Sequence, residues 1–393
     1  MNKSERTTGA LVSVLYFVRM LGLFSVLPIL TLAATDAFQA SALVVGITLG
    51  IYGLCQAALQ IPFGILSDRF GRRPVLMLGL MLFVAGSLLA ATAESIQGVA
   101  IGRALQGAGA IAGVLLAVVA DEVRFEFRSA VMAMIGASIA AAFGLSLIVG
   151  PFIYAVGGLS AVFYLAAVTG CFAWVLVGFL PSSGGPSENR PSVPVLDSPL
   201  WRNGALQGLN LSIFLNHFLL MSSFLVIPKL LLGWDIPVAE HGWVYFGVLL
   251  GSFGLMLPAM IRWGKSGSVV LRVIPGILVM ALGMLLLALS VSAWQGVTGL
   301  LVFFAGFNYL EASLPALVSK VAPESARGRA MGVYSTSQFL GIFVGGSLGG
   351  WLLDEWSLSA LLLINALIAV IWMVMLVGLS RVPVLQDTRA QGS

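Results

Sequence analysis

Charged side chains are scarce in this chain. Asp, Glu, Lys and Arg make up 9% of its 393 residues, against about 25% in soluble domains. Hydrophobic residues reach 59%, and the mean hydropathy is +1.03. So little charge excludes an ordinary soluble globular protein, and the composition predicts an all-α polytopic membrane protein.

Cysteine and catalytic motifs are also lacking. Cys55 and Cys171 both lie inside apolar runs, at a spacing that suits neither a disulfide framework nor a metal site. The sequence has no HExxH, GxSxG or Walker loop, and no paired intramembrane aspartates. These absences argue against an enzyme and against an ATP-driven pump, and we expect neither a metal nor another cofactor.

Long apolar runs fill the chain instead. A helix needs about 20 apolar residues to cross the hydrocarbon of a bilayer, and twelve runs meet that length. Their approximate ranges are 9–32, 42–66, 74–93, 96–120, 130–155, 159–180, 203–232, 240–262, 268–290, 295–319, 329–352 and 357–380. The sequence therefore predicts twelve transmembrane helices.

One connection stands apart from the short ones. Residues 181–200 contain five prolines together with glycine and serine, a composition typical of a flexible tether. We expect an N-terminal six-helix bundle at 1–180, a cytoplasmic linker at 181–202 and a C-terminal six-helix bundle at 203–393. A shift of 199 positions aligns Arg128, Met132, Ser138 and Gly150 with Arg327, Met331, Ser337 and Gly349, and such parallel repeats are common in transporters.

The basic residues indicate the orientation. All but three of the 20 Lys and Arg residues (Arg19, Arg103 and Lys229) fall in the termini and loops of one side. That side is cytoplasmic by the positive-inside rule, so both termini are expected in the cytoplasm. The net charge of +4 therefore reflects topology, and nucleic-acid binding is not expected. Arg19 inside the long first run also argues against a cleaved signal peptide.

Four charges are concentrated in GILSDRFGRRP (64–74), between the second and third runs. Gly64 is expected to let the second helix pack closely, and Gly71 to permit a tight turn. Asp68 can face a helix N-terminus, and Arg72 can reach Asp121 at the end of the fourth run. Such contacts would act as a latch that holds the cytoplasmic helix ends together in one conformation.

This segment resembles the loop signature G-x-L-x-D-R-x-G-R-R of the major facilitator superfamily, although Ser67 stands where alanine is commoner. GRALQGAGA (102–110) resembles the fourth-helix signature of proton-coupled members, and IVGPFIYAVGG (148–158) partly resembles the fifth-helix antiporter signature. The resemblance covers the whole chain and is closest to the YajR-like members of the drug/proton antiporter-like branch, without their extra C-terminal domain. It implies a latch formed by Gly64, Asp68, Arg69, Gly71, Arg72, Arg73, Asp121 and Arg128.

Three ionisable residues lie well inside predicted spans: Arg19, Arg103 and Glu311. Each costs about 2.5–3.5 kcal/mol if it is unpaired at mid-bilayer. In the superfamily's fold the first, fourth, seventh and tenth helices line the central cavity, and all three residues fall on those helices. We hypothesise that Glu311 couples transport to protons, with Arg103 and Arg19 contributing, because a change in carboxylate–arginine distance moves a proton. The alternatives are a structural ion pair of Glu311 with Arg19 or Arg103, and substrate contact alone.

Aromatic and polar residues on the same helices are candidates for a small-molecule site. Those predicted to bind substrate are Tyr16, Met20, Phe24, Gln106, Phe214, His217, Phe304, Asn308, Tyr334 and Gln338. His217 could titrate near neutral pH or merely pack. Gly144, Gly150 and Pro151 are expected to bend the fifth span and let it approach the eighth.

The sequence thus predicts a proton-coupled secondary transporter that exports small organic or amphipathic compounds by rocker-switch alternating access. A transporter of a specific metabolite, such as a sugar or organic anion, is the alternative within transport, and a transporter-derived sensor is the alternative outside it. We expect a monomer in the bacterial inner membrane whose partners are substrate, protons and lipid.

Overall fold

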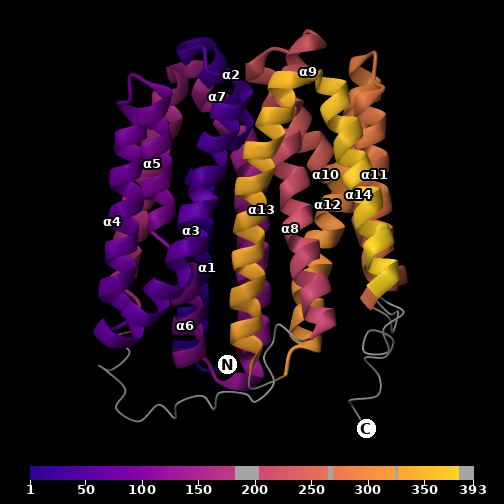
Figure 1. Cartoon of the computed structure of the whole chain (residues 1–393). Helices are drawn as coiled ribbons and strands as arrows, with labels where there is room; N and C mark the ends of the chain where they lie inside the picture. The colour runs from indigo at the N-terminus through magenta and orange to yellow at the C-terminus, as the bar shows by residue number, and fades with distance from the viewer. Residues whose placement is uncertain (182–202, 264–268, 324–325, 380–393) are drawn as a thin grey trace. The chain divides into compact units, whose positions relative to one another are not determined.

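The computed structural model describes residues 1–181, 203–263, 269–323 and 326–379. Regular structure in these ranges is helical, without strands. The helices are α1 (Lys3–Phe24), α2 (Leu27–Phe38), α3 (Ala42–Phe70), α4 (Arg72–Ala91), α5 (Ile96–Ala108), α6 (Ala112–Glu122), α7 (Phe125–Val177), α8 (Gly204–Phe224), α9 (Ile227–Gly233), α10 (Val238–Trp263), α11 (Val269–Ala288), α12 (Ala293–Val321), α13 (Arg327–Glu355) and α14 (Leu358–Leu379) (Figure 1).

The chain divides into two compact units. The first comprises residues 1–190 and 237–245, and the second comprises 191–236 and 246–393. The linker expected at 181–202 lies almost wholly outside the described residues. Within the first unit α7 packs along α1 and α4, and within the second unit α13 packs along α8 while α11 packs along α12 and α14.

All twelve predicted spans fall on helices. Within the described ranges, ten helical segments are long and apolar enough to cross a membrane. One of them, α7, runs for 53 residues and breaks at Gly157 and Gly158, so it carries the fifth and sixth runs. The eleventh run coincides with α13, which has 29 residues. The predicted all-α polytopic fold is confirmed.

Polar caps set several helix starts. Asn2 and Glu5 form a reciprocal capping box at α1, and Ser41 accepts a hydrogen bond from the Val44 backbone at α3. Asn203 accepts from the Ala205 backbone at α8. Caps of this kind satisfy N–H groups that have no partner inside the helix.

Three predicted spans are interrupted rather than continuous. The first breaks between α1 and α2 just before Pro28, and the seventh breaks between α8 and α9 just before Pro228. The fourth breaks between α5 and α6 at Gly109. Proline removes a backbone donor and glycine lowers the cost of leaving helical dihedrals. The break at Gly109 matters below, because its carbonyl accepts a hydrogen bond from a buried arginine.

The bend expected at Gly144, Gly150 and Pro151 stays a prediction. Helical dihedrals continue through Pro151, and the break comes at Gly157 and Gly158, where Gly158 has φ +68°. Gly150 instead permits close packing, since an added Cβ would overlap the Ser25 carbonyl of the α1–α2 junction. The expected approach to the eighth span is found one turn away, where a Cβ on Gly242 would lie 3.0 Å from the Ile148 carbonyl oxygen.

The second unit repeats this arrangement with a glycine stripe. Gly341, Gly345 and Gly349 of α13 face Phe214, Phe218 and Ser222 of α8, and a Cβ on any of them would overlap that helix. Small residues at every fourth position let two helix backbones approach closely. Gly150 and Gly349, which the internal repeat aligns, therefore both permit close helix packing, each in its own unit.

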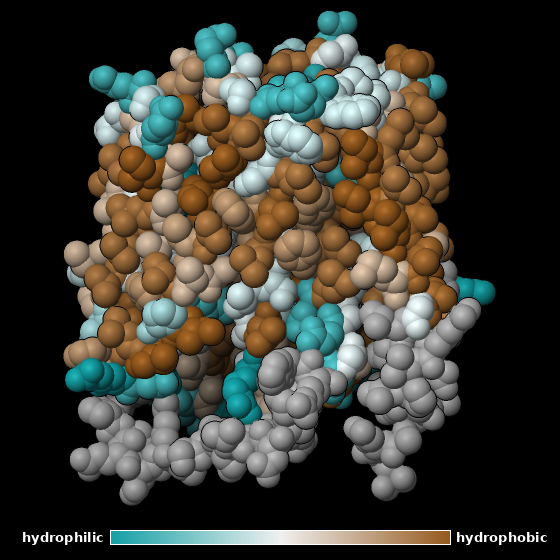
Figure 2. All heavy atoms as spheres, in the orientation of Figure 1, coloured by the Kyte–Doolittle hydropathy of each residue, from teal (hydrophilic) through white to brown (hydrophobic). Residues whose placement is uncertain are grey.

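The surface fits a lipid environment. Large exposed hydrophobic side chains include Ile61, Phe152 and Val168 in the first unit and Leu250 and Leu271 in the second. Figure 2 shows hydrophobic residues over the middle of the helices and hydrophilic residues toward their ends. An apolar belt bounded by polar ends is what a bilayer requires of spanning helices.

We expect Gly345→Ala to lower stability by about 1–3 kcal/mol, because its Cβ would force α13 away from α8. Gly332→Ala on the same helix is the matched control: its Cβ would meet nothing within 4 Å, and alanine favours a helix by about 1 kcal/mol over glycine. Thermal unfolding of the detergent-solubilised proteins measures both. Equal midpoints for the two variants would contradict close packing at Gly345.

Candidate functional site

The second unit places a carboxylate among polar side chains from three helices. We call Asn216 and His217 of α8, Glu311 of α12 and Gln338 of α13 the glutamate cluster. Glu311 accepts hydrogen bonds from the Asn216 amide at 3.3 Å and from the Gln338 amide at 3.3 Å. Its side chain is 39% exposed, although it lies in the second half of an apolar span.

His217 is the ionisable neighbour of this carboxylate. Its Nε2 lies 3.7 Å from Glu311 Oε2 and 2.8 Å from the Gln338 amide nitrogen. With that amide donating, Nε2 accepts and the proton sits on Nδ1, 3.3 Å from the Ile213 carbonyl. The ring also meets Phe307 edge-on at 5.7 Å. His217 is therefore part of the polar cluster rather than an isolated packing residue.

Other predicted cavity residues of this unit are distributed around the cluster. The Asn308 amide donates to Ser252 of α10 at 2.9 Å. Phe304 is a core residue that contacts Phe224 and Phe307. Phe304, Asn308 and Glu311 of α12 thus each make different contacts.

Two further candidates lie on the helices that carry the cluster. Phe214 stacks on Phe218 one turn before His217. Tyr334 is buried on α13 one turn before Gln338. Their helices therefore bring both close to the glutamate cluster along the chain.

The first unit holds two almost fully buried arginines. We call Arg19 of α1, Tyr52 and Gln56 of α3, and Arg103 and Gln106 of α5 the arginine cluster. Nη2 of Arg19 donates to the Tyr52 hydroxyl, the Gln56 amide oxygen and the Gly109 carbonyl at 3.0–3.1 Å. Arg19 is 1% exposed, and its guanidinium lies over the Phe83 ring.

Arg103 is equally buried, at 1% exposure. It donates to the Gln106 amide oxygen at 3.0 Å and to the Leu49 carbonyl at 3.3 Å, and it lies 5.0 Å above the centre of the Tyr52 ring. Gln106 in turn donates to Ser87. All these partners are neutral, and no carboxylate among the described residues of this unit lies within ion-pair distance of either arginine.

The remaining candidates of the first unit are apolar or satisfied locally. The Tyr16 hydroxyl donates to the Ala112 carbonyl at 2.8 Å. Met20 is buried beside Arg19 in sequence, and Phe24 meets Phe143 edge-on at 5.3 Å. All three residues lie on α1, the helix that carries Arg19.

The loop between α3 and α4 makes the ion pair expected of it. Arg72 Nε lies 2.9 Å from Asp121 at the end of α6, and Nη1 lies 2.6 Å from both Asp68 and Ser67 Oγ. Gly71 has φ +91°, which favours glycine. The close packing expected at Gly64 is wrong, since an added Cβ there would meet nothing within 4 Å.

Two neighbouring arginines bind helix ends rather than carboxylates. Arg128 donates to the Val123 and Ala120 carbonyls at the end of α6, and Arg73 donates to the Gly178 carbonyl after α7. An arginine at such a position donates hydrogen bonds to backbone carbonyls that have no partner inside the helix. Arg69 lies over Phe70. Together with Arg72 and Asp121, these contacts tie α4, α6 and α7 within the first unit.

A further ion pair, between Glu5 and Arg124, is not predictable from the sequence. Glu5 at the start of α1 binds the Arg124 side chain at 2.7 Å and its backbone N–H at 3.3 Å. The side-chain hydrogen bond to Glu5 raises the pKa of Arg124 above its ordinary value. Glu5 stands where a capping box is common, but nothing in the sequence indicates a partner 119 positions away.

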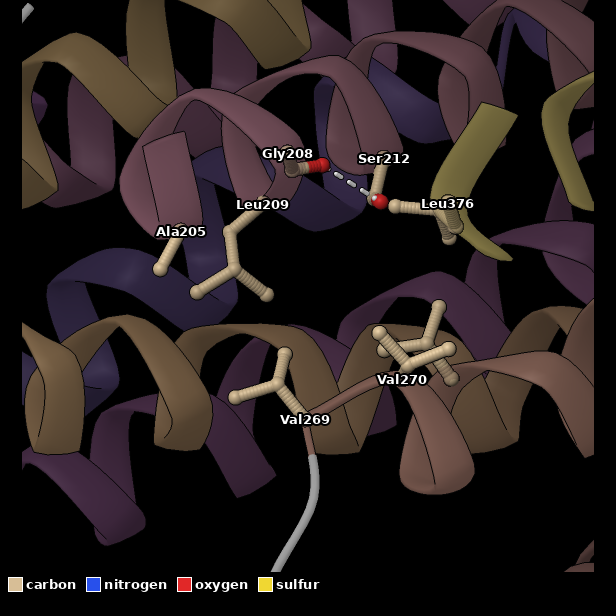
Figure 3. A pocket seen from close by; sticks show the side chains of 8 residues that line it. Ala205, Gly208, Leu209, Ser212, Val269, Val270 and Leu376 are labelled. Atoms are coloured by element: carbon tan, nitrogen blue, oxygen red, sulfur yellow. Dashed lines mark hydrogen bonds between the residues drawn. The ribbon is translucent and has the colours of Figure 1, made fainter. Parts of the chain in front are cut away.

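The second unit also contains an apolar cavity between α8, α11 and α14, lined by Ala205, Leu209, Val269, Val270 and Leu376 among others (Figure 3). Its volume is about 10 Å³, which is room for about one water molecule. Its one hydroxyl, that of Ser212, already donates to the Gly208 carbonyl. The cavity is therefore a packing defect and too small for a substrate.

The family comparison agrees with these features. The family model described as Major Facilitator Superfamily matches residues 12–307 and 209–392. The chain belongs to the major facilitator superfamily. It is 38% identical over 400 residues to the inner membrane transport protein YajR of Escherichia coli, covering 100% of this chain and 87% of that protein. It is 26% identical over 352 residues to the multidrug resistance protein MdtH of Yersinia pestis, covering 85% and 84%.

Solved structures support the same fold. The bacterial homologue of the human lysosomal transporter Spinster, inward-facing and occupied, superposes with a TM-score of 0.77 at 11% identity, covering 97% of this chain and 98% of that one. The human organic anion transporter MFSD10 gives a TM-score of 0.72 at 18% identity, covering 95% and 100%. The chain is thus a multi-pass membrane protein and a secondary transporter, and not an enzyme.

We expect Asp121→Asn to destabilise the protein by about 1–3 kcal/mol, because Arg72 is buried and would lose the less exposed of its two carboxylate partners and keep only Asp68. Glu122→Gln, which neutralises the next carboxylate along the chain, is the matched control. Thermal unfolding midpoints in detergent provide the comparison. If both variants unfold at the wild-type midpoint, the Arg72–Asp121 ion pair does not contribute to stability.

Proposed function

We propose that this transporter exports small organic compounds in exchange for protons, by alternating access of its two six-helix halves. The observation that carries the proposal is the glutamate cluster. A carboxylate inside an apolar span destabilises the inserted helix, so such residues are usually functional. The Glu311 side chain is 39% exposed there. Its ionisable neighbour is a histidine, and its other partners are amides.

The surroundings of Glu311 suit a group that gains and loses a proton. The amides of Asn216 and Gln338 donate to the carboxylate, and each hydrogen bond is long, at 3.3 Å. Protonation of Glu311 would replace one accepted bond by one donated bond without leaving a strong ion pair broken. Movement of α8 or α13 against α12 would change these distances and with them the protonation of Glu311.

A purely structural role for Glu311 has less support. Among the described residues of the second unit, no lysine or arginine lies within ion-pair distance of this carboxylate. Arg19 and Arg103, the alternative partners considered from the sequence, already bind neutral groups of the first unit. A helix-fastening ion pair would need a cation that these contacts do not supply.

The loop contacts supply the conformational part of the proposal. Arg72, Asp68 and Asp121 form the centre of the latch, which we place at the cytoplasmic ends of the helices, with both termini on the same side. Release of these contacts in one state of the cycle would let the helix ends separate. The transporter would operate as a monomer in the bacterial inner membrane, where its relative in Escherichia coli is named as residing.

We expect Glu311→Gln to reduce compound-driven proton exchange at least tenfold, because the amide cannot carry the proton. Everted vesicles acidified by respiration, with a pH-sensitive dye and a panel of organic cations, anions and neutral compounds, measure the exchange. Glu94→Gln, which neutralises an exposed carboxylate, is the control and should respond like the wild type.

Equal responses of the wild type and Glu311→Gln would show that another group carries the proton. A wild type that transports a labelled compound without moving protons would contradict antiport itself. Both results are informative only if the variants reach the membrane in equal amounts, which an immunoblot of the vesicles establishes.

A further inference from the structure

The interior of the first unit carries two positive charges that its own residues do not balance. Arg19 and Arg103 are each 1% exposed, and their hydrogen-bond partners are a hydroxyl, amide oxygens and backbone carbonyls. Burying one unpaired ion costs several kcal/mol even after the surroundings relax. Two such ions side by side therefore need an explanation beyond helix packing.

Tyr52 connects the two arginines. Its hydroxyl accepts from Arg19 at 3.1 Å, and its ring lies beneath Arg103 with 5.0 Å between the guanidinium carbon and the ring centre. Both cations thus contact one side chain, and α1, α3 and α5 converge there. The charges form a single site instead of two independent structural contacts.

The polar atoms left over in this site are mostly donors. Nε and Nη1 of Arg19, Nε of Arg103 and the amide nitrogen of Gln56 are buried and find no partner among the described residues. The amide oxygen of Gln60, one turn further along α3, is the neighbouring unpartnered acceptor. A buried donor without an acceptor destabilises the folded protein, and a charged donor does so more strongly. A group that offers only acceptors and a negative charge would satisfy them.

We propose that the arginine cluster binds the carboxylate of a small organic anion, which makes organic anions the substrate class of this transporter. Guanidinium groups pair with carboxylates through short, charge-assisted hydrogen bonds, and the Gln56 amide can donate a further bond. Phe83, whose ring lies beneath Arg19, offers an apolar wall to the body of the ligand. This assignment adds a substrate class to the proposed antiport. It rests on that proposed function only for the direction of transport.

The cluster is closed in the conformation described, because neither arginine is open to solvent. An anion would therefore reach it in another state of the transport cycle, in which helices of the first unit separate. Binding has to be measured on protein that is free to change state, so reconstitution into lipid nanodiscs is preferable to a conformation fixed by an antibody.

Isothermal titration of the nanodisc protein tests the assignment with matched probes: benzoate, octanoate and succinate, their uncharged amides, and benzylamine as a cation. We expect at least one carboxylate to bind and its amide and benzylamine to bind at least tenfold more weakly. Arg19→Met should weaken carboxylate binding at least tenfold, and Arg6→Met, at an exposed position, should leave it unchanged.

A milder variant keeps the test decisive if Arg19→Met does not fold. Gln56→Leu removes the unpartnered amide donor, together with the amide oxygen that accepts from Arg19, and retains both arginines. We expect it to weaken carboxylate binding about three- to tenfold. Equal affinity of carboxylates and amides for the wild type, or unchanged affinity in a folded Gln56→Leu and Arg19→Met, would overturn the assignment.

The same titration separates this inference from the antiport proposal. Glu311→Gln should still bind the carboxylate, because the two clusters belong to different units. Carboxylate binding without proton exchange would refute antiport and leave the anion site standing. Proton exchange driven by amines or neutral compounds, with no carboxylate binding, would refute the anion site and leave antiport standing.

Discussion

The absence of water in the hydrocarbon of the bilayer is the constraint from which the other features follow. Each backbone and side-chain polar group inside a span has to find its partner in the protein. Continuous helices satisfy the backbone, and where α5 and α6 are interrupted at Gly109, the freed carbonyl accepts from Arg19. The same constraint explains why polar side chains of the spans occur in clusters: each member needs the others.

The two units satisfy this constraint with opposite charges. The first unit contains two arginines held by neutral groups, and the second contains one carboxylate held by two amides and a histidine. Each cluster is internally connected but electrically unbalanced. A transporter benefits from such imbalance, because a site that is fully compensated has little to gain from a proton or a substrate. The unbalanced charges of Arg19 and Arg103 in one half, and of Glu311 in the other, are thus the chemical basis of the proposed binding and proton exchange.

Much of the fold follows from the sequence, because its spans are longer and more apolar than any soluble helix requires. The twelve runs and the Arg72–Asp121 pair were predictable, the latter because both residues lie at helix ends on the same predicted side of the membrane. The interruptions were not, since Gly109, Pro28 and Pro228 leave the hydropathy of their runs unchanged. The environment of Gly64 was not predictable either, because a glycine in a helix does not reveal whether a neighbour approaches it.

The candidate site was predictable in its charged residues and not in their partners. Arg19, Arg103 and Glu311 stand out because charge inside an apolar run is rare. His217 and Gln338, by contrast, are 121 positions apart, and only the packing of α8 against α13 brings them together. Tyr52 and Gln56 likewise look like ordinary polar residues of a helix until Arg19 is placed between α1 and α3. Helix rotation and tilt, which neither hydropathy nor periodicity fixes, decide these contacts.

The central claim is that Glu311 exchanges a proton when the transporter binds its compound. Infrared difference spectroscopy of the reconstituted protein measures this most directly, since a protonated carboxyl group absorbs apart from a carboxylate. The account predicts a protonated-carboxyl band that changes on addition of the compound and is lost in Glu311→Gln. A band that is identical in the wild type and Glu311→Gln, or one that does not respond to the bound compound, would contradict it.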